Sequence, residues 1–240
     1  MGIDENERGQ AILDAAAELL LRHGYNKTTM SDVANAVDLH RGLVYLHFSS
    51  KDALVEALIV RELWWYAEVW SNHLEADPLG GTVASVYRGV LHTLKQLPLM
   101  AAILTQDNRV FGKYLRKPGN LFARLPTTSF TRDFLLIMRE AGVVRQDVNI
   151  AAMAFIMDTL SPAILETLSS GMQESREDSS RSGLPFYDEL METVAEMLER
   201  MLTPAEGADL EAGKAVMHRL VEDTRARFIQ TQNQQKENKM

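Results

Sequence analysis

Apolar residues recur at the three- and four-residue spacing of an α-helix along almost the whole chain of 240 residues. No run alternates apolar and polar side chains for long enough to indicate a β-strand. In residues 6–23, for example, Ile12, Ala16 and Leu20 share one apolar stripe, and Gly24 follows where a helix commonly ends. The pattern predicts an all-α protein.

Composition narrows the classes of protein to which the chain can belong. Hydrophobic residues make up 46% and charged residues 24%, which is typical of a globular protein. The absence of cysteine excludes disulfides, thiolate zinc sites and cysteine nucleophiles, and it agrees with a reducing compartment. No stretch approaches the ~18 apolar residues of a membrane-spanning helix, and the polar, acidic N-terminus does not match a secretory signal. We therefore expect a cytoplasmic protein.

The charges are distributed unevenly. The net charge is −8, from 25 basic and 33 acidic side chains. Such a charge argues against a protein whose whole surface binds nucleic acid or anionic lipid. In residues 22–51, however, four Lys and Arg stand against two Asp, a local net charge of +2, and three of the six histidines fall there too. Any phosphate binding is expected in this window.

The basic window contains a pattern of two short helices joined by a tight turn. Thr29 can cap the first helix, with Asp32 three residues later as in a capping box. Asp38 then interrupts the apolar pattern and tolerates the left-handed geometry of a tight turn. A short helix follows at about 40–48. Such a pair forms a helix-turn-helix unit, whose second helix enters the DNA major groove, although many small helical bundles show the same periodicity.

The rest of the chain is predicted to be a series of helices. A long one begins after Ser49 or Ser50 and continues to about Leu74. The further helical segments lie at about 82–97, 99–106, 107–116, 128–141, 149–171, 185–202 and 208–228, with loops at 118–126 and 173–183. Pro162 is expected to kink or divide its helix, and the polar residues after Phe228 are expected to be disordered.

The segment from Arg8 to Leu54 resembles the N-terminal domain of the TetR family of one-component transcriptional regulators. The matching features stand in the family's order and spacing without a gap, and they are Ile12-Leu13, Ala15-Ala16, Gly24-Tyr25, Thr28-Thr29, Asp32-Val33-Ala34, Gly42, Val44-Tyr45, His47-Phe48 and Ser50-Lys51-Asp52-Ala53-Leu54. The other residues fit only the family's general plan. The resemblance implies a three-helix DNA-binding domain at 1–52, joined by a long fourth helix to a helical ligand-binding and dimerisation domain at 53–203. An additional C-terminal helix and a disordered tail would follow at 204–240.

The resemblance also implies which residues contact DNA. They belong to the start of the second helix, the third helix and the start of the fourth, and they are Thr29, His40, Arg41, Gly42, Leu43, Tyr45, His47 and Lys51. Arg41 would donate two hydrogen bonds to guanine, and Gly42 would let the backbone approach the bases. Tyr45, His47 and Lys51 would hold phosphates, and Thr29 would offer its hydroxyl to another at the start of its helix.

Several of these residues have a purely structural alternative. Thr29 can be a helix cap and nothing else, Tyr45 and His47 can be packed aromatic side chains, and Lys51 can be a solvated surface lysine. Val44 and Phe48 are expected in the core.

Three positions depart from the family pattern. Asp38 stands where glycine usually occupies the turn, and it adds negative charge close to the expected DNA. His40 replaces a capping Ser or Thr, which costs about 1 kcal/mol of helix stability, although it can itself contact DNA. Leu43 replaces a residue that is often polar and can contact a thymine methyl group or simply lower affinity.

A pocket for a small hydrophobic effector is expected among the fourth to eighth helices. Its candidate lining consists of large apolar side chains and one carboxylate, namely Trp64, Trp65, Glu68, Trp70, Met100, Phe111, Phe134, Met138 and Met157. Further polar candidates are His73, His92 and Asp158. Mostly apolar cavities suit such ligands, but any of these apolar residues can instead be ordinary core.

A homodimer is expected because one short helix reads few base pairs, whereas two helices ~34–36 Å apart read a palindrome. Apolar stripes on two helices are the candidate interface, namely Ile150, Met153, Met157, Leu160, Ile164 and Leu168 at 149–171 and Leu190, Val194, Met197 and Met201 at 185–202. The alternative is that each subunit buries them internally.

The sequence thus predicts a ligand-responsive transcriptional regulator of the repressor type, which binds a palindromic operator in double-stranded DNA and is released by a small hydrophobic effector. We find no cofactor or metal motif, and the lack of HExxH, phosphate-loop and G-x-S-x-G patterns argues against an enzyme. The alternative is a helical ligand-binding or scaffold protein without specific DNA binding, which the acidic composition, Asp38 and Leu43 favour.

Overall fold

The computed structural model describes residues 5–124, 130–171 and 187–237. These residues are helical and include no strand, which confirms the predicted all-α class. The loop predicted at 173–183 lies outside the described residues, as does the end of the loop predicted at 118–126.

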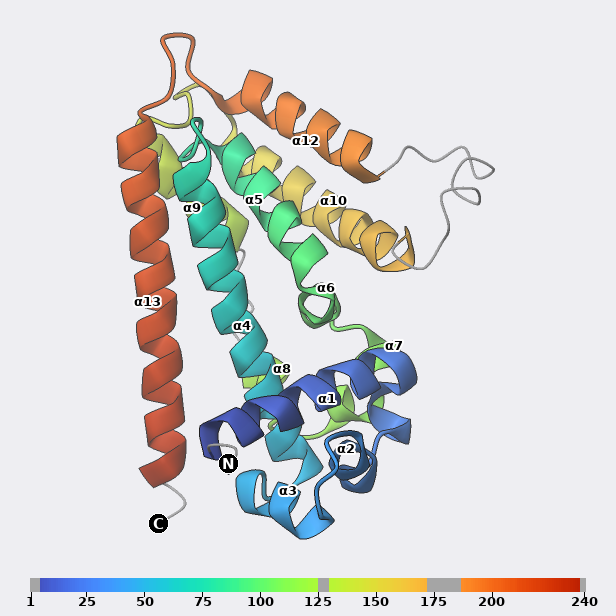
Figure 1. Ribbon diagram of the computed structural model, residues 1–240. Coiled ribbons are helices and arrows are strands. Elements are labelled where there is room, and N and C mark those ends of the chain that lie inside the picture. The colour runs from blue at the N-terminus through green and yellow to red at the C-terminus, as the bar shows by residue number, and fades with distance from the viewer. Residues whose placement is uncertain (1–4, 125–129, 172–186, 238–240) are drawn as a thin grey trace. The chain divides into compact units, whose positions relative to one another are not determined.

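The order of the helices follows the predicted segments closely (Figure 1). They are α1 (Glu5–Lys27), α2 (Met30–Ala36), α3 (Arg41–His47), α4 (Lys51–Ala76), α5 (Val83–Gln96), α6 (Pro98–Leu104), α7 (Asn108–Phe111), the 3-10 helix η1 (Gly112–Arg116), α8 (Leu121–Arg124), α9 (Phe130–Glu140), α10 (Ile150–Gly171), α12 (Tyr187–Leu202) and α13 (Leu210–Glu237). α10 passes through Pro162 without being divided. α13 continues to Glu237 instead of ending near Phe228, because residues 229–237 contain no Gly or Pro to stop it.

The chain forms two compact units. Unit 1 consists of Met1–Leu63 and Leu97–Thr127, so the residues that follow α5 are grouped with the helix-turn-helix segment. Within it, α1 packs against α2, α7 and η1, and α2 packs against α3 (Figure 1). The limits predicted at 52 and 203 divide the chain by function, into a DNA-binding domain, a ligand-binding and dimerisation domain and a C-terminal extension. They stay predictions.

Gly24 allows the two parts of unit 1 to approach closely. Its φ is +74°, and α1 is kinked there. A Cβ atom at this position would lie 2.3 Å from the carbonyl oxygen of Arg109, which begins the turn of α7. Only glycine combines the positive φ with this backbone contact.

We expect Gly24→Ala to lower the free energy of unfolding by about 2–3 kcal/mol, because alanine disfavours positive φ and its methyl group would displace the Arg109 backbone. Urea denaturation measures the change. Gly42→Ala is the matched control, since a Cβ there meets nothing within 4 Å and Gly42 lies inside a helix. That variant should be as stable as the wild type or more stable by about 0.5–1 kcal/mol. Equal stability of both variants would contradict the close approach.

Unit 2 consists of Trp64–Gln96 and Thr128–Met240, so α4 contributes residues to both units. α5 packs against α12, α10 packs against α9 and α12, and α13 packs against α9. The core of this unit includes Leu135, Met138 and Leu198, and Met217 and Val221 of α13 are buried in it. The first part of the C-terminal extension is therefore an integral part of unit 2.

Candidate nucleic-acid interface

The start of α2 has the predicted capping box. The Thr29 hydroxyl accepts a hydrogen bond from the Asp32 backbone N–H at 3.2 Å. The Asp32 carboxylate accepts hydrogen bonds from the Thr29 N–H and hydroxyl, both at 2.8 Å, and these bonds hold the pKa of Asp32 below its usual value. The Thr29 hydroxyl already donates to a carboxylate, which favours the capping role over a phosphate contact.

The turn between α2 and α3 has the geometry expected from the sequence. Asp38 adopts a φ of +51°, and the Leu39 N–H donates to the Ala34 carbonyl at 2.9 Å. Ala34 is buried, as expected of a small residue where the two helices cross. The aspartate thus adopts the positive φ that this turn requires.

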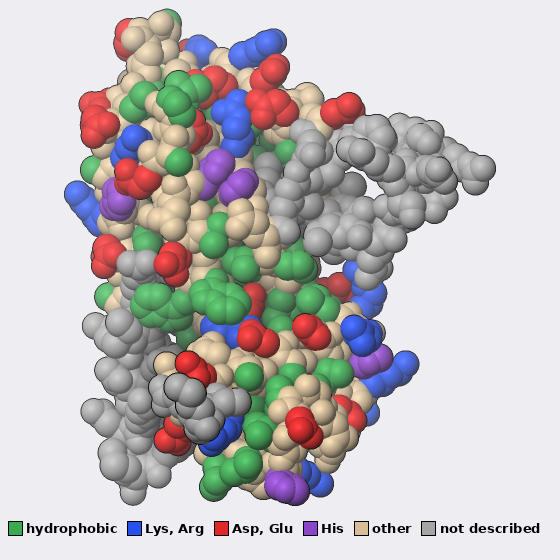
Figure 2. Space-filling view, viewed as in Figure 1, with side chains coloured by type: hydrophobic (Ala, Val, Ile, Leu, Met, Phe, Trp, Pro, Cys, Tyr) green, Lys and Arg blue, Asp and Glu red, His purple; other side chains and the backbone are tan. Residues whose placement is uncertain are grey.

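α3 buries one side and exposes the other. Val44 is fully buried and anchors the helix. The exposed residues on or beside the helix are His40, Arg41, Gly42, Tyr45 and Leu46. The His40 side chain makes no capping hydrogen bond, in agreement with the missing Ser or Thr. Figure 2 shows hydrophobic, histidine and basic side chains at the lower end of the molecule, over α3.

Arg41 and Tyr45 form a pair on the exposed side of α3. The Arg41 Nη2 donates a hydrogen bond to the Tyr45 hydroxyl at 3.1 Å. The guanidinium carbon also lies 5.2 Å from the centre of the tyrosine ring, in cation–π geometry. This bond uses one of the five N–H donors of the arginine, so the others can bind further acceptors.

Two other candidates on α3 are only partly accessible. Leu43 and His47 are half-buried. The His47 ring lies 6.3 Å from that of Phe48, which is also half-buried. His47 therefore combines some packing with some exposure, and both interpretations made from the sequence fit this position.

Lys51 fastens the start of α4 to the end of α1. Its Nζ donates to the backbone carbonyls of Tyr25 at 2.7 Å and Thr28 at 2.8 Å, and it lies 3.8 Å from the centre of the Tyr25 ring. Burial, followed by the nearby charge of Lys117, lowers the pKa of Lys51. Two of its three donors serve the fold, so Lys51 is not the solvated lysine that was the sequence-based alternative.

A polar network joins three segments of unit 1, and sequence analysis did not identify it. The Asp52 carboxylate accepts hydrogen bonds from the Tyr25 hydroxyl at 2.5 Å and from Lys117 Nζ at 2.6 and 2.8 Å. Lys117 Nζ also donates to the Tyr25 hydroxyl at 2.8 Å. Burial raises the pKa of Asp52, but the hydrogen bonds from Lys117 and Tyr25 outweigh it, and the pKa lies below its usual 3.8. The network ties the residues after η1 to the helix-turn-helix segment.

We expect Lys117→Met to lower the free energy of unfolding by about 1 kcal/mol at pH 7, because the contacts of this partly exposed ion pair are lost. Since the folded pKa of Asp52 is depressed, its contribution is present above about pH 4 and is lost as the pH falls through the folded pKa. Urea unfolding at pH 7 and in steps from 4.5 to 2.5 should therefore show the two proteins converging in acid. Lys113→Met, at an exposed lysine of η1, is the control and should change stability little. A constant difference at every pH would contradict the role of Asp52.

The nine candidates for the effector pocket are distributed over the two units. Met100 and Phe111 are fully buried in unit 1. In unit 2, Trp70, Phe134, Met138 and Met157 share the hydrophobic core, whereas Trp65 and Glu68 are exposed and Trp64 is half-buried. These placements agree with ordinary core packing for six of the residues, and the proposed ligand contacts stay predictions.

The polar candidates for the pocket have partners of their own. His73 and His92 stack with ring centres 4.5 Å apart. Burial, followed by the charge of His92, lowers the pKa of His73. Asp158 accepts a hydrogen bond from the Thr131 hydroxyl.

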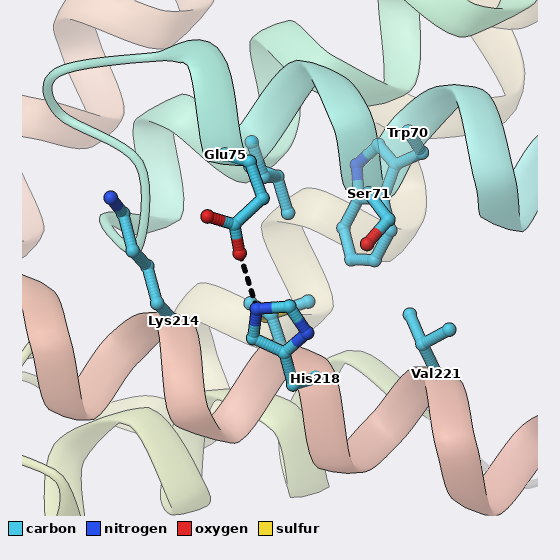
Figure 3. Close-up of a pocket in the computed structure, with 8 residues that line it drawn as sticks. Trp70, Ser71, Glu75, Lys214, His218 and Val221 are labelled. Atoms are coloured by element: carbon cyan, nitrogen blue, oxygen red, sulfur yellow. Dashed lines mark hydrogen bonds and ion pairs between the residues drawn. The ribbon is translucent and has the colours of Figure 1, made fainter.

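A hollow in unit 2 lies between α4 and α13 (Figure 3). It is lined by Trp70, Ser71, Leu74, Glu75, Lys214, Met217, His218 and Val221. His218 and Glu75 hydrogen-bond across it. Its volume is about 230 Å³ even when space open to solvent is included, which is below the ~300–1,000 Å³ of typical ligand pockets. Of the candidate lining residues expected from the sequence, Trp70 belongs to it.

The described residues include no group of three or more His, Cys, Asp or Glu that could hold a metal ion. Among the same residues, no helix is long and apolar enough to cross a membrane.

Comparison with known proteins places the helix-turn-helix segment among regulators. Residues 12–58 match the family model described as bacterial regulatory proteins, tetR family. The HTH-type transcriptional repressor Rv1474c of Mycobacterium tuberculosis is 26% identical over 169 residues, which cover 70% of this chain and 86% of that protein.

Two solved structures have a similar fold. The fatty acid degradation regulator FadR from Bacillus halodurans superposes with a TM-score of 0.55 at 16% identity, covering 82% of this chain and 96% of that chain. A gamma-butyrolactone receptor (ArpA like protein) superposes with a TM-score of 0.51 at 17% identity, covering 92% of this chain and all of that chain. At such identities the likeness concerns the fold alone.

Proposed function

We propose that this chain, which belongs to the TetR family of bacterial regulatory proteins, represses transcription by binding a palindromic operator as a homodimer and is released by a small hydrophobic effector. Membership of the family makes it a DNA-binding transcriptional regulator. The operator, the dimer and the effector are the proposed part. The observation that carries the proposal is that α3 exposes Arg41 and Tyr45 to solvent while Val44 of the same helix is buried.

In this proposal α3 enters the major groove. Arg41 reaches guanine with the donors that Tyr45 leaves available, because a guanidinium can bind the O6 and N7 atoms of guanine together. Tyr45 holds the guanidinium in place before DNA binds. The Arg41 side chain therefore loses less conformational entropy when it binds the base. In the same docking, the Tyr45 hydroxyl would donate a hydrogen bond to a backbone phosphate beside the groove.

The proposed dimer interface is the exposed face of α10. Phe155, Ile156 and Leu160 are 72%, 42% and 40% exposed, and their spacing places them on one side of the helix. Exposed apolar patches of this kind commonly mark protein interfaces. On the neighbouring α12, Met197 and Met201 are exposed one turn apart.

This face differs from the stripe that sequence analysis selected on α10. Ile150, Met153, Met157 and Ile164 of that stripe are buried within unit 2 itself, as its alternative interpretation stated. Leu160 is the member that lies on the exposed side. The proposal therefore assigns to the partner subunit the side of α10 that carries Phe155, with Leu160 at the boundary between this side and the buried stripe.

A small organic effector would act by shifting the population of dimers away from the spacing that fits DNA. A structure with this fold is a gamma-butyrolactone receptor, and we extend the idea of a small organic ligand to this chain by analogy. The network of Asp52, Tyr25 and Lys117 supports such coupling, because it fastens the segment 97–127 to the start of α4 beside α3.

Selection of duplexes from a random-sequence pool tests the proposal. The full chain should enrich a palindrome whose half-sites lie about one helical turn, or a multiple of it, apart. Its affinity should fall steeply between 50 and 200 mM salt, as expected when several phosphates are neutralised. Recovery of unenriched DNA at every salt concentration would instead favour a helical ligand-binding or scaffold protein.

A further inference from the structure

Leu46 is the most exposed of the large hydrophobic residues in the described part of the chain, with 81% of its surface accessible. It lies in α3, the helix that also carries Arg41 and Tyr45. Single exposed leucines are common on protein surfaces, so its exposure alone carries no conclusion. Its position on the helix and the open space around it are the observations on which the inference rests.

Leu46 points away from the protein at the centre of the exposed side of α3. Each residue of an α-helix turns by about 100°, so Leu46 lies about 200° from Val44, the buried anchor of the helix. Gly42 lies two residues before Val44 and therefore on the same outer side, one turn from Leu46. Arg41 and Tyr45 occupy the flank of this side.

Gly42 leaves the outer side open for the leucine. A Cβ atom at Gly42 would meet nothing within 4 Å. Side chains of a helix lean towards its N-terminus, so the Leu46 side chain extends over the turn that contains Gly42. The centre of the outer side is thus an aliphatic surface with no neighbouring side chain in front of it.

We propose that Leu46 reads a thymine in each half-site of the operator by packing against its 5-methyl group. This inference rests on the proposed function, in which α3 lies in the major groove. There the thymine methyl group is the apolar group that a base pair presents, and apolar side chains are its usual partners. The leucine thus adds a preference for thymine next to the base that Arg41 contacts.

The test uses the palindrome selected by the wild-type chain, with single thymines replaced by uracil, which pairs alike but lacks the methyl group. Uracil at one thymine position of a single half-site should weaken wild-type binding about fourfold, as expected for the loss of one buried methyl group. Uracil at the same position of both half-sites should weaken it about fifteenfold. Leu46→Ala should lose a similar factor on the thymine operator and show no further loss with uracil. Leu46→Met, which keeps an aliphatic side chain of similar volume, should retain the thymine preference.

Leu79→Ala is the matched control, because Leu79 is 48% exposed and belongs to the turn after α4 in unit 2. It should bind the thymine and uracil operators as the wild type does. All variants should keep the wild-type melting temperature, since the residues replaced are exposed.

The outcomes separate the two proposals. If the wild type and Leu46→Ala lose the same factor with uracil at every position, or if the palindrome has no thymine within reach of α3, the role of Leu46 is overturned while the proposed function stands. If the wild type enriches no palindrome, the proposed function is overturned, and the role of Leu46 with it.

Discussion

Replacing Arg41 with alanine is expected to weaken binding to the selected operator by roughly thirtyfold to twenty-thousandfold. A bidentate contact between arginine and guanine discriminates by about 1–3 kcal/mol, and the dimer makes it in two half-sites. Because Arg41 is exposed and bonds only to Tyr45 among the contacts described for it, the variant should fold normally. Fluorescence anisotropy with the palindrome and with a scrambled duplex measures the loss.

Two variants separate base reading from general charge. Arg145→Ala removes an exposed arginine of unit 2 that pairs with Asp147 at 2.5 Å, and it should bind the operator as the wild type does. Tyr45→Phe keeps the ring beneath the guanidinium but removes the hydroxyl that accepts its hydrogen bond, and it should cause a smaller loss than Arg41→Ala. Unchanged operator affinity of Arg41→Ala would contradict the docking of α3.

Replacing Phe155 with glutamate is expected to raise the dissociation constant of the dimer by about a thousandfold or more. The change removes a large apolar contact from each subunit, worth about 2 kcal/mol apiece, and it places a charge from both copies in the interface. Since Phe155 is 72% exposed in the single chain, the subunit itself should keep its helical content. Sedimentation velocity over a range of concentrations measures the constant.

The same substitution should also abolish tight operator binding, because a single subunit reads one half-site only. Leu79→Glu provides the control, as it introduces the same charge at an exposed leucine that does not lie on α10 or α12. It should remain dimeric and bind the operator. A Phe155→Glu protein that is still dimeric at micromolar concentration would rule out this face of α10 as the interface.

Local features of the helix-turn-helix segment could be predicted because they depend on neighbours in the chain. The capping box of Thr29 and Asp32 spans three residues, and the positive φ of Asp38 depends on the tolerance of one side chain. The burial of Val44 follows from helical periodicity. These features needed no knowledge of the tertiary structure.

Features that join distant segments could not be predicted in this way. Lys51 bonds to carbonyl groups 23 and 26 residues away, and Asp52 binds Lys117 across 65 residues. No periodicity in the sequence indicates such pairs. The division of the candidate pocket residues between units could not be predicted either, because Met100 and Met157 are both large and apolar but are buried in different units.

The sequence by itself determined the helical class, the order of the helices and the turn that presents α3, since periodicity, capping and turn chemistry act over a few residues. Only the tertiary structure decided which side of each helix remains exposed. Apolar residues occur on both sides of α10, and packing within unit 2 covers Met153 but leaves Phe155 in solvent. In α3 the tertiary structure likewise leaves the apolar Leu46 in solvent, because no other segment that the structure describes packs over it.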